Sequence, residues 1–264
     1  MSCSVQVSLM CALLKNCRSV IRANVKDHRS VVKKPPVFCY GEGVTFQRAR
    51  SDEQREIRRR VILDTAAAML NEMSVAEVSL NELSRRVGLA KSNVLRYFES
   101  REAVLLELLD DFLGRWLDDL TGELVAGIQP AADPVVRATQ LGEVLSESLA
   151  SRVVLCDLFG AQGGVLEHNV SVEVVTRHKR ASLAKLATMS ELLRGHVPEL
   201  GEGAQLFCLM TLISAGALSS YVPPPPSLLA AYAEEPALAV HNLNLRDALR
   251  ISITSSLLGV LPRA

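Results

Sequence analysis

Aromatic residues are scarce in this sequence, at 4% of 264 residues, and only one of them is a tryptophan. Alanine, leucine and valine supply most of the 48% hydrophobic content instead. Sandwiches and barrels are rich in aromatic and β-branched residues, whereas helices favour alanine and leucine. The scarcity therefore opposes a sandwich or barrel and favours an all-α fold with a well-buried core.

Features that carry catalytic chemistry are also missing. No glycine-rich phosphate loop is present, the five histidines are scattered, and no Ser/His/Asp or Cys/His set is evident. None of the six cysteines forms a CxxC pair or has a histidine at metal-ligand spacing. These absences oppose an enzyme and predict no metal or cofactor.

The cysteines and the hydropathy indicate a cytoplasmic protein. Cys156 and Cys208 lie in apolar helical stretches, where a buried free thiol is expected and a redox switch has no support. Free thiols suit a reducing cytoplasm. No stretch approaches the roughly 18–20 apolar residues that span a bilayer, so no membrane partner is expected.

A net charge of one sign is lacking as well, because 29 Lys and Arg balance 29 Asp and Glu. Residues 1–43 hold seven basic against two acidic residues, residues 44–105 eleven against nine, and residues 106–264 eleven against eighteen. A local positive face suffices to attract phosphate, because charges beyond about 8–10 Å are screened at physiological salt. The N-terminal part is therefore the candidate for binding nucleic acid, and the acidic remainder should stay away from it.

Residues 1–50 form a basic extension without a recognisable domain. The apolar run VSLMCALLKNC lacks the basic start and cleavage site of a signal peptide, and the prolines of KKPP break any helix. Two interpretations stay open. Either the extension is a disordered basic arm that adds loose affinity for DNA, or it is not translated and Val44 is the start. The second interpretation rests on Gly41–Gly43, which a purine-rich ribosome-binding site would encode in this frame.

A long helix is expected to begin at Ser51, because SDEQ at 51–54 has the form of a capping box. It should end before Ser74. Apolar residues that recur with a period near 3.6 should face the core; they are Ile57, Val61, Ile62, Ala66, Met69, Leu70 and Met73. Three arginines lie on the opposite face: Arg55, Arg58 and Arg59.

Residues 79–98 have the pattern of two short helices joined by a tight turn. A second capping box, SLNE at 79–82, starts the first helix. Gly88 supplies the turn, because a residue without a Cβ can take a positive φ. The second helix should run from about Ala90 to Tyr97, with Val94 and Phe98 as core anchors. Four polar side chains suited to base edges and phosphates are left outward: Lys91, Ser92, Asn93 and Arg96.

Ser100 caps the next helix and places Arg101 in its first turn, where a phosphate would bind well. Two short helices with a glycine turn also occur in proteins that never touch DNA. The three consecutive caps, the outward polar set and the basic first helix favour DNA binding over that alternative.

From about residue 53 to residue 113 the chain resembles the TetR family of one-component transcriptional regulators. The resemblance rests on a long helix ending in AAAMLNE, then SLNELSRRVGLAKSNVLRYF, then SREAVLLELL. It implies a three-helix DNA-binding domain at 51–113, with the helix-turn-helix at 79–98, and a helical ligand-binding and dimerisation domain at 114–264. The predicted DNA-binding set comprises Ser79, Lys91, Ser92, Asn93, Arg96, Tyr97 and Arg101.

Two residues depart from the family pattern. Ala90 stands where a serine usually caps the recognition helix, which forfeits about 1 kcal/mol. Leu95 stands where a tyrosine often contacts phosphate, and the five donors of Arg96 reach further and could offset that loss. The departures bear on the phosphate contacts rather than on the family.

The chain after residue 114 is expected to be helical throughout. The expected helices span residues 133–152, LCDLFGAQ with an end at Gly163-Gly164, residues 171–196, 203–221 and 245–261. The 203–221 helix is apolar nearly all round, so it is buried or shared. The resemblance implies that it forms a four-helix dimer interface with the 245–261 helix. The alternative is that both helices pack within one subunit.

An effector site would lie between the fourth helix and the helices of residues 133–196. The candidate lining residues are Trp116, Leu120, Leu145, Leu149, Phe159 and His178. Trp116 serves equally well as core filling, and a solvated face suits His178 better than a ligand contact. The body carries no charged cluster, so a hydrophobic small molecule is expected.

The sequence therefore predicts a homodimeric repressor that binds a near-palindromic double-stranded DNA operator and is released by a small molecule. Activation instead of repression stays open. A helical scaffold for protein partners, with a degenerate helix-turn-helix, is the alternative from another class. Salt-dependent binding to DNA separates the regulator from the scaffold.

Overall fold

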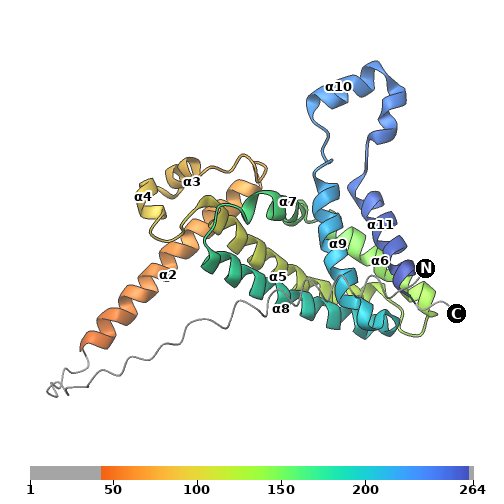
Figure 1. Ribbon diagram of the computed structural model, residues 1–264, viewed down its shortest axis with the longest axis horizontal. Coiled ribbons are helices and arrows are strands. Elements are labelled where there is room, and N and C mark those ends of the chain that lie inside the picture. Colours follow the sequence, from red (N-terminus) through yellow and green to blue (C-terminus); the bar gives the residue numbers. More distant parts are fainter. Residues whose placement is uncertain (1–42, 262–264) are drawn as a thin grey trace, which may run out of the picture. The chain divides into compact units, whose positions relative to one another are not determined.

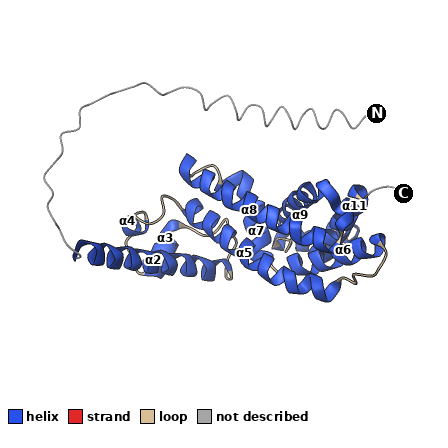
Figure 2. Cartoon of the chain, turned by 90° about the horizontal axis from the view of Figure 1, so that it is seen from below, coloured by secondary structure: helices blue, strands red, loops and turns tan. Residues whose placement is uncertain are grey.

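The computed structural model describes the backbone of residues 43–261 and the side chains of residues 52–240 and 242–261. The predictions made for residues 1–42 lie outside this part of the chain. Every regular element within it is helical, which confirms the all-α fold (Figures 1 and 2). The chain from Ala49 onward forms one compact unit, which holds the hydrophobic core.

The helices are joined by short connections. The first ones are α2 (Gly43–Leu70), α3 (Leu80–Val87), α4 (Lys91–Val94) and α5 (Arg101–Gly127). The later ones are α6 (Pro134–Ala150), α7 (Val153–Ala161), the π-helical turn η1 (Gln162–Leu166), α8 (Val172–His196), the 3₁₀ segment η2 (Pro198–Gly203), α9 (Ala204–Ser219), α10 (Pro226–Glu234), the 3₁₀ segment η3 (Pro236–His241) and α11 (Leu245–Val260).

Helix α2 begins at Gly43, so the prediction that it begins at Ser51 is wrong. No proline or glycine stands between residues 44 and 51, and a serine cap contributes only about 1 kcal/mol. The helix therefore continues through the capping sequence. Ile57 and Val61 were expected inward but are 57% and 48% exposed, because the apolar face of α2 meets the core only from Ile62 onward.

The local signals of the helix-turn-helix are confirmed. The Ser79 hydroxyl accepts the Glu82 N–H, and Gly88 ends α3 with a φ of 73°. The Ser100 hydroxyl caps α5 by accepting the Ala103 N–H. The α-helix after the turn is shorter than the predicted Ala90–Tyr97 span. Ala90 supplies no side-chain cap, and the backbone after Val94 continues as turns with i→i+3 hydrogen bonds.

One hydrophobic cluster runs through the described chain from Ile62 to Leu257. Helix α5 contributes ten buried residues to it and crosses the predicted domain boundary at 113/114 without a break. The helix-turn-helix part (residues 52–100) and the body are therefore joined by a continuous helix rather than by a linker. Gly163 and Gly164 do not end a helix as expected, since both lie inside η1, which continues α7.

Two helix pairs in the body approach closely at glycines. A Cβ on Gly142 of α6 would lie 2.5 Å from the Thr254 hydroxyl of α11, and a Cβ on Gly216 of α9 would lie 2.5 Å from the Gly160 nitrogen of α7. Cys156 and Cys208 are buried free thiols in α7 and α9, as predicted. Burial raises the pKa of each thiol to about 12, so both stay protonated at neutral pH.

Helix α9 is buried on one side only. Phe207, Cys208 and Leu212 face the core, whereas the opposite side carries exposed apolar residues; these are Leu206, Leu209, Met210 and Ile213. The segment Pro198–Ser219 is long and apolar enough to span a bilayer by composition, contrary to the sequence expectation, and 44% of its most apolar window is buried inside the protein. A core helix gives the same signal.

Candidate nucleic-acid interface

Helix α4 presents a polar surface on a buried anchor. Val94 and Phe98 are buried in the hydrophobic cluster beneath it, and α4 packs chiefly against α3. Ser92, Asn93 and Arg96 lie one or two positions from Val94, and side chains at that spacing leave a helix in different directions. All four predicted reading residues are exposed: Lys91, Ser92, Asn93 and Arg96.

A hollow of about 540 Å³ lies between α2 and α4. Arg55 and Arg58 line it from α2, while Asn93, Arg96 and Tyr97 line it from the α4 side. The sequence placed both α2 arginines on the outer face of the first helix but did not include them in the DNA-binding set. Their i, i+3 spacing places both side chains on one face of α2, and this face borders the hollow. This spacing is the sequence signal that could have added them to the set.

Other cations of this region are neutralised by acidic partners. Arg85 and Arg86 both bond to the Glu82 carboxylate, and these bonds lower the pKa of Glu82 to about 2. Arg86 also pairs with Glu72 at 2.7 Å. By contrast, Arg55, Arg58, Lys91 and Arg96 are exposed and form no ion pair with another described residue. The free positive charge is therefore concentrated around the hollow.

Three residues of the predicted DNA-binding set have other contacts. Arg101 is half-buried and donates to the carbonyls of Ala76 and Val78, at 3.3 and 2.8 Å, so it holds the loop before α3. The Ser79 hydroxyl is occupied by its cap hydrogen bond. Tyr97 is half-buried and lines the hollow, and its carbonyl accepts a hydrogen bond from Arg59.

Arg59 joins three elements beneath the interface, although the sequence placed it on the outer face of α2. Its guanidinium bonds the Glu107 carboxylate of α5, donates to the Tyr97 carbonyl at 2.9 Å and lies 4.2 Å from the centre of the Phe98 ring. These contacts hold α2, α5 and the turn that follows α4 together. Only tertiary packing brings these groups together, so no local sequence signal could have found them.

We expect Arg59→Met to lower the free energy of unfolding by about 2 kcal/mol, because it leaves Glu107 and the Tyr97 carbonyl without this donor. Arg60→Met is the matched control. Arg60 is 48% exposed and pairs with Asp64 and Asp111, so its loss should cost less than about 1 kcal/mol. Urea unfolding of both variants measures the difference. Equal losses would contradict a central role for Arg59.

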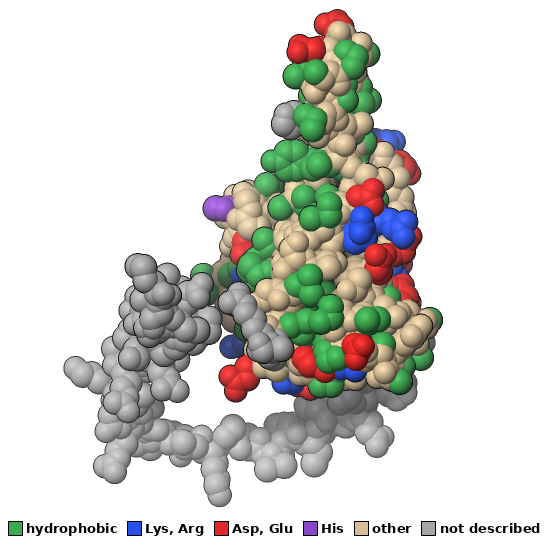
Figure 3. Space-filling model, turned by 90° about the vertical axis from the view of Figure 1, so that its right-hand side faces the viewer, with side chains coloured by type: hydrophobic (Ala, Val, Ile, Leu, Met, Phe, Trp, Pro, Cys, Tyr) green, Lys and Arg blue, Asp and Glu red, His purple; other side chains and the backbone are tan. Residues whose placement is uncertain are grey.

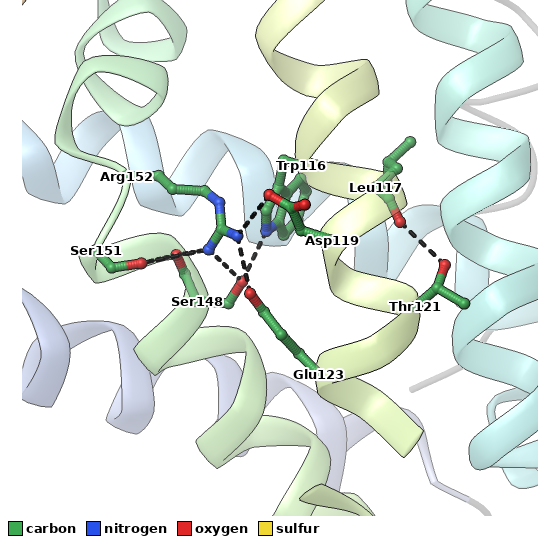
Figure 4. Close-up of polar contacts among 8 residues, drawn as sticks. All are labelled: Trp116, Leu117, Asp119, Thr121, Glu123, Ser148, Ser151 and Arg152. Atoms are coloured by element: carbon green, nitrogen blue, oxygen red, sulfur yellow. Dashed lines mark hydrogen bonds and ion pairs between the residues drawn. The ribbon is translucent and has the colours of Figure 1, made fainter. Parts of the chain in front are cut away.

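The six predicted effector residues do not converge on one cavity. The side chains of Leu120, Leu145 and Leu149 are fully buried in the core, because they fill the contact between α5 and α6. Trp116 is 1% exposed and donates from Nε1 to the Ser148 hydroxyl at 2.8 Å. As Figure 4 shows, this hydroxyl also accepts from Arg152, which bonds Asp119 and Glu123 in turn. Trp116 therefore fills the core, and its indole N–H has a hydrogen-bond partner.

His178 is buried rather than solvated, which corrects the expectation for its helix face. Its Nδ1 lies 3.0 Å from Asp110 of α5, and its Nε2 lies 3.1 Å from the Gln162 amide of η1. The ring therefore joins α8, α5 and η1. It also borders a hollow of about 510 Å³ near Arg59 and Glu107.

Phe159 is the predicted effector residue that lines the most apolar cavity described here. This cavity has about 190 Å³ and lies among α5, α7, α8 and α9. Apolar side chains form most of its wall, and Gln162, Lys179 and Ser182 supply polar groups. Its α9 side is formed by Leu209, Leu212 and Ile213. Since Leu209 and Ile213 are 40% and 53% exposed, the cavity opens toward the outer face of α9.

Two polar contacts connect the helices around this cavity to the segments that flank the helix-turn-helix. Asp157 of α7 accepts the Val75 N–H at 2.8 Å, in the loop between α2 and α3. Glu99, just before α5, accepts the Ser171 N–H at the start of α8. These contacts link α7 and α8 to the segments just before and just after the helix-turn-helix.

The chain is similar in part of its sequence to known regulators of transcription. The chain is 28% identical over 85 residues to the HTH-type transcriptional regulator BetI of Rhizobium meliloti, which covers 32% of this chain and 40% of BetI. It is 38% identical over 58 residues to the HTH-type transcriptional regulator EthR of Mycolicibacterium smegmatis, covering 22% and 27%. The chain thus spans less than half the length of these curated relatives.

Solved structures of similar fold include the fatty acid degradation regulator FadR of Bacillus halodurans, with a TM-score of 0.45 and 15% identity over 76% of this chain and 94% of that one. A TetR transcriptional regulator from Rhodococcus sp. has a TM-score of 0.42 and 14% identity, covering 76% and 95%.

Two family models cover nearly all of the chain from residue 62 onward. Residues 62–108 match the model described as bacterial regulatory proteins, tetR family. Residues 110–264 match the model described as tetracyclin repressor-like, C-terminal domain. The second match alone spans more than half of the chain, and the first covers the helix-turn-helix whose caps and exposed cations are described above. The protein belongs to the TetR family of transcriptional regulators.

Proposed function

We propose that the protein is a homodimeric repressor that binds a near-palindromic DNA operator and is released by a small apolar effector. The observation that carries this proposal is the exposed set on α4 beside Arg55 and Arg58 of α2. Amide and guanidinium groups on a short exposed helix can read base edges in a major groove, and the arginines next to them can neutralise phosphates. Such a protein acts where its operator is, in the cytoplasm.

The outer faces of α9 and α11 support the dimer. Leu206, Met210 and Ile213 of α9 are exposed, and so are Ile251 and Leu258 of α11. Large exposed apolar patches on a soluble protein mark interaction sites. In a two-fold dimer the two α4 helices would lie about 34–36 Å apart, which matches half-sites one helical turn apart.

The apolar cavity beside Phe159 supports the effector. A ligand there would contact α7 and α8, the two helices that hold the DNA-reading part through Asp157 and Glu99. Binding can shift an equilibrium only through a difference in affinity between two conformations. A ligand that prefers the arrangement with the wrong α4 spacing would release the operator.

Binding of the full chain to its own upstream DNA at several salt concentrations tests the proposal. Four free cations in each subunit predict eight phosphate contacts at most, and therefore a slope of log affinity against log salt of about −7. Scrambled DNA of equal length is the control and should bind more weakly. A slope near zero would favour a helical scaffold with a degenerate helix-turn-helix. Tight binding with increased transcription in a reporter assay would instead indicate an activator.

A further inference from the structure

Exposed apolar side chains are spread over the body and over residues 220–244, between α9 and α11 (Figure 3). A surface of this kind specifies no particular ligand. The cavity beside Phe159 is different, because it lies among four helices and has a few polar groups in an apolar wall. These polar groups are Gln162 of η1 and Lys179 and Ser182 of α8. Their own hydrogen bonds decide which chemical group of a ligand they can bind.

The size of the cavity limits the ligand to about one ring. An engineered apolar cavity of about 150 Å³ takes up benzene, so the cavity of about 190 Å³ here holds a six-membered ring with a short substituent. A fused ring system or a long acyl chain would extend beyond it. Leu113, Leu186 and Leu212 form apolar wall, and Phe159 adds an aromatic ring. This wall favours a hydrocarbon body for the ligand.

The Gln162 side chain is held with its amide oxygen unused. Asp110 only accepts hydrogen bonds, so the His178 Nδ1, 3.0 Å away, carries a proton, and the Nε2 of the neutral ring is an acceptor. The Gln162 amide nitrogen donates to this Nε2 at 3.1 Å and to the Glu167 carboxylate at 2.8 Å. Both amide N–H groups are then occupied, and the amide oxygen accepts from no other described residue. Gln162 therefore offers a ligand an acceptor.

The Ser182 hydroxyl is a second group with spare hydrogen-bonding capacity. It lies 3.4 Å from the His178 Nε2, whose single lone pair is already used by Gln162 at the shorter distance. A hydroxyl can turn to donate elsewhere and can accept at the same time. Ser182 therefore offers a ligand both a donor and an acceptor.

The charge of Lys179 is already balanced. Its ammonium group is paired with the Glu167 carboxylate at 2.6 Å. Burial raises the pKa of Glu167, but hydrogen bonds from Lys179 and Gln162 outweigh that effect and hold the pKa below its usual value. The pair therefore keeps both charges at neutral pH. An anionic ligand would have to break this pair, and a cationic ligand would be repelled by the ammonium group, so an uncharged ligand fits best.

We propose that this cavity binds a compact, uncharged ring compound with one hydroxyl group, such as an alkylphenol. The ligand hydroxyl donates to the Gln162 amide oxygen and accepts from the Ser182 hydroxyl, so it satisfies both groups at once. A phenol, whose pKa is about 10, is uncharged at neutral pH. The inference names the ligand class of the proposed effector site and rests on that proposed function.

Isothermal titration calorimetry of the full chain with 4-ethylphenol tests the ligand class. 4-Ethyltoluene is the matched control ligand, because a methyl group of similar size replaces the hydroxyl. We expect 4-ethylphenol to bind at least about tenfold more tightly, since 4-ethyltoluene leaves two polar groups without a partner. The anion 4-ethylbenzoate should also bind at least about tenfold more weakly than 4-ethylphenol. Tighter binding of either control, or no binding of 4-ethylphenol at millimolar concentration, would overturn the proposal.

Ser182→Ala tests whether the hydroxyl is bound at the assigned end of the cavity. The affinity for 4-ethylphenol should fall about fivefold to tenfold, while the affinity for 4-ethyltoluene should not change. Thr188→Ala is the matched control, because it removes an exposed hydroxyl of the same helix that bonds only the Ala184 carbonyl, and it should change neither affinity. Gln162→Leu should show the same selectivity as Ser182→Ala. An equal loss for both ligands, or no loss for either, would contradict the assigned contacts.

Operator binding in the presence of 4-ethylphenol separates this inference from the proposed function. If 4-ethylphenol binds with the expected selectivity but operator affinity stays the same, the ligand class stands and the ligand-released repressor fails. If the chain binds its operator specifically but neither ring compound binds to the chain, the ligand class fails and the DNA-binding regulator stands.

Discussion

Replacing Arg55, Arg58 and Arg96 together by glutamine should weaken operator binding roughly a thousandfold at physiological salt. These arginines line one hollow, and none pairs with another described carboxylate. A dimer loses six cations in this variant, so the slope of log affinity against log salt should become shallower by about 5. Fluorescence anisotropy with labelled operator over a range of salt concentrations measures both quantities.

Arg85→Gln is the matched control for that experiment. Arg85 is also an exposed arginine of the helix-turn-helix, with a side chain 72% exposed, but it is bound to Glu82 at 2.6 Å. Its removal changes the net charge by the same amount per residue while leaving the hollow intact. We expect little change in the salt slope. If Arg85→Gln weakened binding as much per arginine removed as the triple variant, the general charge of the domain would govern affinity rather than the hollow.

The signals that predicted the DNA-reading part are local in the sequence. Ser79 and Ser100 bond N–H groups three residues away, and Gly88 relieves a strain within its own backbone. Each cap and the glycine turn can be recognised in the sequence without knowing what packs against it. The exposure of Ser92 and Asn93 follows from the burial of Val94, because side chains one or two positions apart leave a helix in different directions.

The features that the sequence did not predict depend on distant contacts. Arg59 looks like a surface residue until Glu107 and Phe98 are brought beside it. Ile57 has the right period to face the core, but none of the described elements covers that end of α2. The effector candidates did not converge on one cavity for the same reason. Apolar residues on a helix indicate burial, but whether a cavity remains among them depends on how the four helices pack. Of the six candidates, Phe159 borders the apolar cavity.

The contact between α7 and α9 positions both the cavity wall and the hydrogen bond to the loop before α3. Helix α7 carries Phe159 in the cavity wall and Asp157 in the contact with Val75. Its position against α9 is set at Gly160 and Gly216, where the two backbones touch. A change at this crossing should therefore reach stability and DNA binding together, although it lies in neither site.

Gly216→Ala should accordingly lower the free energy of unfolding by about 3 kcal/mol. A Cβ there would lie 2.5 Å from the Gly160 nitrogen, 2.7 Å from the Phe159 carbonyl carbon and 2.9 Å from the Phe159 Cβ. Backbone atoms cannot turn aside as the end of a flexible side chain can, so α7 and α9 must separate. The separation reduces packing around Cys156 and Cys208, which have no exposed surface.

Gly122→Ala is the control, because a Cβ at Gly122 in α5 would meet nothing within 4 Å. Alanine is a better helix former than glycine by up to about 1 kcal/mol, so this variant should be as stable as the parent or more so. Urea unfolding must be done at one fixed protein concentration, since association contributes to the stability of a dimer. Equal behaviour of the two alanine variants would mean that α7 and α9 can repack around a methyl group. Their close approach would then set neither the stability of the fold nor the position of Asp157.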